Sequence, residues 1–166
     1  MAALQITGSP MASAGRPGDV DATQKYVLGT VVAGTDSLGN FAEYIYLKGV
    51  ASTIVGSVVV YDEAALTALL TVNGGAAGVG PVAVALAIVD ASTKFGWYGI
   101  TGTFPTDVVA NCADNAKMGR ETTDGKVGDG FSAGDQIVGL ISRAATTAAA
   151  VVNCQYTRPF VGVNVA

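Results

Sequence analysis

Short runs of β-branched and aromatic residues, separated by clusters of Gly, Asp and Asn, follow one another through most of this sequence. Tyr26–Ala33 (YVLGTVVA) and Phe41–Leu47 (FAEYIYL) form one such pair, with a turn-forming cluster at 34–40 between them. Several short strands at this spacing, in a chain with 22 glycines, are typical of two packed sheets or a closed sheet. The pattern predicts an all-β fold: an antiparallel β-sandwich, jelly-roll-like or barrel-like.

The same criteria place further strands along the chain, namely Ser57–Tyr61, Val82–Val89, Phe95–Gly102, Gln136–Ser142 and Ala148–Thr157. Asp62–Val72 is ambiguous, because its alanines and leucines suit a helix whereas its threonines suit a strand. We interpret this segment as a turn followed by a strand. Asp124 and Gly125 predict a type I′ hairpin between Met118–Thr122 and Lys126–Val127.

Residues 1–24 differ from the rest of the chain, since they are rich in Ala, Gly, Ser, Pro and Asp and show no strand or helix period. We predict a flexible or extended N-terminal arm over 1–24 and one all-β domain over 25–166. The arm could become ordered on a partner, or it could be a frayed terminus. The first residues lack the basic and apolar stretches of a secretory signal, so synthesis and retention in a cytoplasm are expected.

The sequence is poor in charge: 13% of its residues are charged, against about 25% in typical globular proteins. Its net charge is −4 and its nine basic residues are scattered, so nucleic-acid binding is not expected. The longest apolar run, Val79–Val89, contains Pro81 and is shorter than the ~20 residues that span a bilayer. Membrane association is therefore not expected either. We expect instead that the weakly charged surface is buried against protein partners.

The chain contains no histidine, which excludes Ser-His-Asp and Cys-His catalysis and histidine ligation of metals. The segment 130–134 (GFSAG) matches G-x-S-x-G, but it lacks an imidazole base and a following helix, so we interpret it as a turn. The segment 78–83 (GVGPVA) matches a dinucleotide fingerprint, but Pro81 and a β-branched run stand where the helix should begin. Neither a cofactor nor an enzymatic activity is predicted.

Acidic residues and cysteines do not indicate a metal site. Asp124, Asp129 and Asp135 do not have the spacing of an EF-hand, so solvated turn residues are favoured over calcium ligands. A carboxylate pair for glycoside hydrolysis stays open, because such a pair forms only in the fold. Cys112 and Cys154 are predicted to be reduced thiols packed in the core.

Tyrosine and tryptophan are enriched among the residues that dominate protein interfaces. In the predicted strand Phe41–Leu47, the two tyrosines share one face and Ile45 and Leu47 share the other, so both faces should be covered. The cover could be this chain, which would make the tyrosines core residues, or a neighbouring subunit. On the second alternative the candidate interface residues are Tyr44, Tyr46, Trp97, Tyr98, Arg16 and Pro17.

Three stretches of the sequence, 82–91 (VAVALAIVDA), 96–99 (GWYG) and 156–161 (YTRPFV), resemble those of a known family. Together with the Ala-, Gly- and Val-rich composition, they make Tyr26–Val161 similar to the head decoration (cement) proteins of tailed bacteriophages. The resemblance implies a virion protein that is made in the host cytoplasm and binds the capsid exterior, where it bridges neighbouring major capsid protein subunits. It assigns no role to an individual residue.

Two other functions share the composition. One is a self-assembling tail, fibre or other particle subunit, which would form long open polymers, whereas a homodimer or homotrimer would favour a decoration protein. The other is a carbohydrate-binding module, in which Trp97 and the tyrosines would form an exposed stacking platform.

Overall fold

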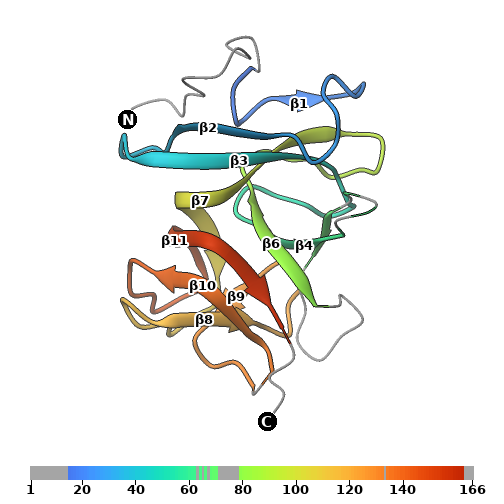
Figure 1. Ribbon diagram of the computed structural model, residues 1–166. Helices are drawn as coiled ribbons and strands as arrows, with labels where there is room; N and C mark the ends of the chain where they lie inside the picture. Colours follow the sequence, from blue (N-terminus) through green and yellow to red (C-terminus); the bar gives the residue numbers. More distant parts are fainter. Residues whose placement is uncertain are drawn as a thin grey trace.

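The computed structural model describes residues 15–62, 64, 66, 68–70, 79–132 and 134–162, and these residues form β-strands and no helix (Figure 1). This confirms the all-β prediction, whereas the sandwich, jelly-roll or barrel-like arrangement stays a prediction. The strands are β1 (Val20–Asp21), β2 (Val31–Thr35), β3 (Phe41–Lys48), β4 (Val58–Tyr61), β5 (Ala68–Leu70), β6 (Gly80–Ala85), β7 (Phe95–Val108), β8 (Lys117–Arg120), β9 (Val127–Gly128), β10 (Gln136–Ser142) and β11 (Ala150–Val161).

The described strands belong to one mixed, hydrogen-bonded sheet. Their order is β2-β3-β7-β9-β8-β10-β11-β6-β4-β5, and β1 pairs with β7 off this path. The pairings are antiparallel except that of β7 with β9, which is parallel where Val108 lies opposite Val127. Because β7 also pairs with β11, the strands β7, β9, β8, β10 and β11 form a closed circuit of pairings.

β7 is the strand that joins the parts of the molecule. Its first half pairs with β3 and its second half with β11, so it passes from the group β1–β3 to the group β8–β11 (Figure 1). The sequence predicted its end at Gly102, but the strand bends there and continues to Val108. Gly102 has a φ of +126°, which glycine adopts without strain. A glycine that marks a bend and one that ends a strand look alike in sequence.

Two hydrophobic clusters lie on the two faces of β3 and its neighbours. Tyr44 and Tyr46 belong to the larger cluster, together with Trp97. Ile45 and Leu47 belong to the second cluster, which contains small side chains from β6. The expected cover on both faces of β3 is therefore supplied by this chain.

The N-terminal boundary differs from the prediction. Residues 1–14 lie outside the described residues, but Val20 and Asp21 of β1 pair with β7, and Pro17 is buried. The Asp21 carboxylate accepts a hydrogen bond of 2.8 Å from the Tyr46 hydroxyl and forms an ion pair with Lys25. Part of the predicted arm over 1–24 is therefore paired with the sheet, a contact that the sequence did not indicate because a two-residue strand among turn residues gives no periodic signal.

The hairpin predicted around Gly125 is present, since β8 and β9 pair with Arg120 opposite Val127. Its turn type differs from the prediction. Type I′ requires a positive φ at both central residues, whereas here Gly125 has a φ of +75° and Asp124 does not have a positive φ. A backbone hydrogen bond of 3.1 Å from the Lys126 N–H to the Thr123 carbonyl closes this turn.

Candidate contact surface

The predicted interface aromatics lie inside the molecule. Tyr44, Tyr46, Trp97 and Tyr98 are each at most 1% exposed, because residues of this chain enclose them. The Tyr44 hydroxyl donates to the Thr35 carbonyl at 2.6 Å, and burial raises the pKa of Tyr46 to about 12. These four side chains cannot make the intersubunit contact predicted for them.

The two other predicted contacts differ from each other, since Arg16 is exposed whereas Pro17 is buried. The burial of Trp97 also removes the stacking platform on which the carbohydrate-binding alternative relied. Strand alternation identified which residues share a face, but it could not show whether this chain or a neighbour covers that face.

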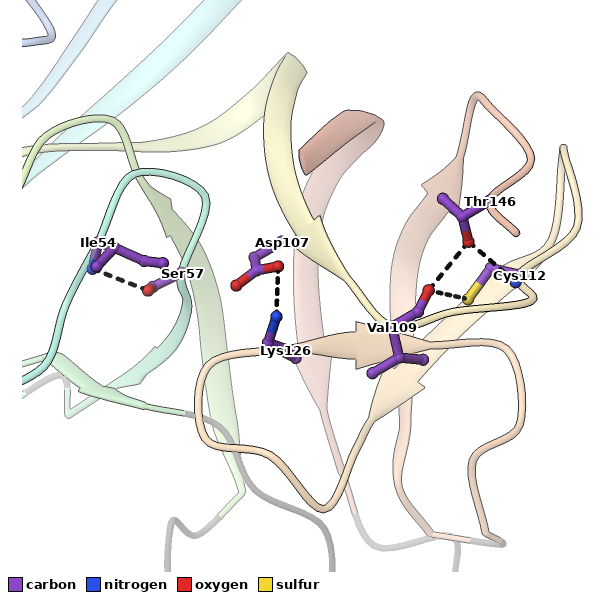
Figure 2. Close-up of polar contacts among 7 residues, drawn as sticks. All are labelled: Ile54, Ser57, Asp107, Val109, Cys112, Lys126 and Thr146. Atoms are coloured by element: carbon purple, nitrogen blue, oxygen red, sulfur yellow. Dashed lines mark hydrogen bonds and ion pairs between the residues drawn. The ribbon is translucent and has the colours of Figure 1, made fainter. Parts of the chain in front are cut away.

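Both cysteines are free, buried thiols, as predicted. Figure 2 shows the surroundings of Cys112, whose backbone N–H donates to the Thr146 hydroxyl at 3.1 Å. That hydroxyl and the Cys112 thiol both donate to the Val109 carbonyl. Burial raises the pKa of both thiols, that of Cys154 to about 11, so they stay protonated and weakly nucleophilic at neutral pH.

Several acidic side chains are held by structural contacts. Asp107 accepts a hydrogen bond of 2.9 Å from the Lys126 ammonium (Figure 2), and Asp135 forms a buried ion pair of 2.8 Å with Arg120. The Asp135 N–H also donates to the Ser132 carbonyl, so the GFSAG segment contains a turn. Within the described ranges, no three His, Cys, Asp or Glu residues are grouped as a metal site would require.

Three apolar side chains, of which two are exposed and one is half-buried, form a row across three adjacent strands. Val138 of β10 lies directly opposite Phe160 of β11, and Phe160 lies directly opposite Pro81 of β6. Directly opposite residues in antiparallel strands point to the same side of a sheet. Val138 is 63% exposed and Phe160 48%. We call Pro81, Val138 and Phe160 the apolar row.

A second feature is a surface recess of about 340 Å³ where the turn before β3 meets β7 and β11. Phe41, the first residue of β3, stands at this recess with 62% of its surface exposed. The other lining residues are polar or small, apart from the ring of Tyr156. They are Asp36, Asn40, Thr101, Gly102, Thr103, Gln155, Tyr156 and Thr157.

Asp36 fixes the geometry of the recess. One of its carboxylate oxygens accepts hydrogen bonds of 2.9 Å from the Leu38 and Asn40 N–H groups. The other accepts one of 3.0 Å from the Thr103 N–H. Because this carboxylate is buried and joins the turn to β7, it holds Phe41 at the end of a rigid loop.

An ion pair lies next to the recess, where its carboxylate contacts Thr101 of the lining. Arg158 of β11 makes two hydrogen bonds to the Glu43 carboxylate, of 2.9 and 2.6 Å, and the Thr101 hydroxyl donates to the same carboxylate. The bonds from Arg158 lower the pKa of Glu43 below its usual range. The surface around the recess therefore presents a compensated pair of charges.

Comparison with family models, with curated proteins and with solved structures found no match to this chain. In the part of the chain that the structure describes, no helix has the length and apolarity needed to cross a membrane. A function has therefore to be inferred from the composition and from the chemistry of the surface.

Proposed function

We propose that this protein is a head decoration protein of a tailed bacteriophage, which binds the exterior of the assembled capsid and bridges neighbouring major capsid protein subunits. The observation that carries the proposal is the apolar row, in which Val138 and Phe160 are left exposed side by side. Large apolar side chains on a rigid sheet, within a weakly charged surface, are typical of protein contact sites. The resemblance in composition and in three sequence stretches to decoration proteins points the same way.

The energetics of such a contact are favourable. Full burial of a valine or phenylalanine side chain contributes about 1.5–3 kcal/mol relative to exposure. A surface with few charges has a small desolvation cost, because few charged groups lose their contacts with water on binding. A ligand that binds only the assembled shell shifts the equilibrium towards that shell, and bridging adds the benefit of multivalency.

The proposal includes a rigid, barrel-like body and association into a homodimer or homotrimer. The closed circuit of pairings through β7 and β11 supports the barrel-like assignment. A discrete oligomer would present several apolar rows at once, so each copy could contact a different capsid subunit. After synthesis in the host cytoplasm, the protein would be located on the capsid exterior.

The test is to mix the purified protein with undecorated phage shells. We expect wild-type protein to co-sediment with the shells and to raise the temperature at which they break. The double variant Val138→Lys/Phe160→Lys should lose both effects, because it places two charges in the contact. Ile88→Lys is the matched control, since Ile88 is also exposed but follows the opposite end of β6.

Circular dichroism would establish that both variants keep the wild-type fold. Absence of binding by wild-type protein would overturn the proposed function, and equal binding by the double variant would overturn the role of the apolar row. Formation of long open polymers by the protein alone would favour a self-assembling tail or fibre subunit instead.

A further inference from the structure

The recess at Phe41 has the features of a preformed binding site. Phe41 keeps most of its ring in water, although a phenylalanine gains free energy on burial. The backbone that carries the ring is held in place, because Asp36 accepts two hydrogen bonds within the preceding turn and one from Thr103 of β7. A ligand would therefore meet an ordered aromatic face and would lose little free energy in ordering it.

The polar groups around the ring are hydroxyls and amides. Thr103 and Thr157 contribute hydroxyls and Asn40 contributes a side-chain amide, whereas the amide oxygen of Gln155 already accepts a hydrogen bond from Arg143. Hydroxyls and amides both donate and accept hydrogen bonds, so they can pair with hydroxyl groups of a ligand in many orientations. This lining suits a ligand that carries several hydroxyl groups around an apolar face.

Charge chemistry argues for a neutral ligand. The Asp36 carboxylate already accepts three backbone hydrogen bonds, and the neighbouring Glu43 is paired with Arg158. An ammonium group would thus find no unpaired carboxylate among these groups, and the Arg143 guanidinium that a phosphate or carboxylate would seek is already hydrogen-bonded to Gln155 and Asn115. An extended peptide strand is disfavoured as well, because Thr101 of β7 is paired on one side with β3 and on the other with β11. The backbone of β7 has no free strand edge at this position, so a ligand would have to be recognised by side chains.

From these features we propose that the recess binds one neutral sugar ring of a carbohydrate chain, with an apolar face of the ring stacked on Phe41. A pyranose combines an apolar C–H face with a rim of hydroxyls, which matches an aromatic ring surrounded by hydroxyls and amides. The recess is open and takes one ring, which suits a unit within a longer chain. This site is separate from the apolar row, so it would add glycan attachment to the proposed contact with the capsid.

The test uses the full-length protein and a panel of neutral oligosaccharides: maltohexaose, cellohexaose and chitohexaose. Titrations are followed by heteronuclear NMR, with an oligogalacturonate as the charged comparison. We expect at least one neutral oligosaccharide to shift the signals of Phe41, Thr101, Thr103 and Thr157. Phe41→Ala should weaken this binding by at least about tenfold, the factor that corresponds to ~1.4 kcal/mol.

Phe160→Ala is the matched control, because it removes another exposed phenylalanine that does not line the recess. It should leave sugar binding unchanged. Thr103→Val, which keeps the shape but removes a hydroxyl, should weaken binding independently of the aromatic ring. The proposal is overturned if no neutral oligosaccharide shifts these signals at a ligand concentration of about 10 mM, because binding with a millimolar Kd would be detected at that concentration. It is also overturned if Phe41→Ala binds as wild type does. Neither outcome affects capsid binding, which is measured with shells and depends on Val138 and Phe160.

Discussion

The ring of Phe104 lies against Gly99, five residues before it in β7. A Cβ atom added at Gly99 would lie 2.5 Å from an atom of this ring, which is closer than packed carbon atoms approach. Phe104 is fully buried between Tyr44 and Tyr156, so it has no free space into which to move. The contact explains why glycine stands in the middle of a central strand, where it is otherwise unfavourable.

We therefore predict that Gly99→Ala lowers the free energy of unfolding by about 1–3 kcal/mol, the usual range for overpacking a core. The measurement is urea denaturation followed by tryptophan fluorescence. Gly130→Ala is the control, because a Cβ there meets no atom within 4 Å. An unchanged or higher stability of Gly99→Ala would show that Phe104 can move aside.

Residue types alone could not assign the site. Tyr44, Tyr46 and Trp97 have the composition of an interface, yet this chain buries them, whereas the exposed aromatic residues are Phe41 and Phe160. No local signal separates these groups, because exposure depends on strands that are distant in sequence. Phe41 shares the strand alternation of Ile45, but its position at the start of the strand leaves it outside the cluster that covers Ile45.

At the scale of strands, prediction was most accurate where apolar runs end at clear turn residues. Gln136–Ser142 was predicted with the bounds that β10 has, and Phe41–Leu47 differs from β3 by one residue. Prediction failed for β7, which continues beyond Gly102, and for β1, which two residues form. Both errors involve pairing with distant strands, which supplies hydrogen bonds that local sequence does not reveal.

The pair of Glu43 and Arg158 joins β3 to β11 across β7, and its contribution to stability should depend on pH. Arg158 lowers the pKa of Glu43 in the folded protein. The contribution is therefore present above the pKa of an unfolded glutamate, about 4.3, and is lost as pH falls through the lower pKa of folded Glu43. Because Arg158 is largely exposed and water screens the pair, we expect at most about 1 kcal/mol.

Chemical denaturation at pH 7 and at pH 3 measures this dependence. Glu43→Gln should be less stable than wild type at pH 7, and the difference should shrink at pH 3. Arg158→Gln should behave in the same way, since either substitution breaks the same pair. A difference that stays constant between the two pH values would contradict the assignment.

For the molecule as a whole, the division between core and surface is compatible with the proposed role in protein contact. Most of the large aromatic side chains pack the two clusters around β7, both cysteine thiols are buried, and Asp107 and Asp135 are paired with Lys126 and Arg120. The side chains that the described residues leave exposed include the apolar row at one place and Phe41 of the recess at another. Both proposals rest on these side chains, which the core does not use.

The contacts of Asp21 predict that the folded domain begins before residue 25. The Asp21 carboxylate accepts the hydrogen bond of the buried Tyr46 hydroxyl, so Asp21→Ala leaves that hydroxyl without this acceptor. An unsatisfied buried polar group costs about 1–3 kcal/mol, and we expect this loss in thermal unfolding both for Asp21→Ala and for deletion of residues 1–24. Adding Tyr46→Phe to Asp21→Ala should restore part of the stability, because it removes the hydroxyl whose proton has lost its acceptor, even though the Lys25 N–H then loses its 3.3 Å hydrogen bond to that oxygen. If the deletion unfolds at the wild-type temperature, β1 is dispensable and residues 1–24 form an arm after all.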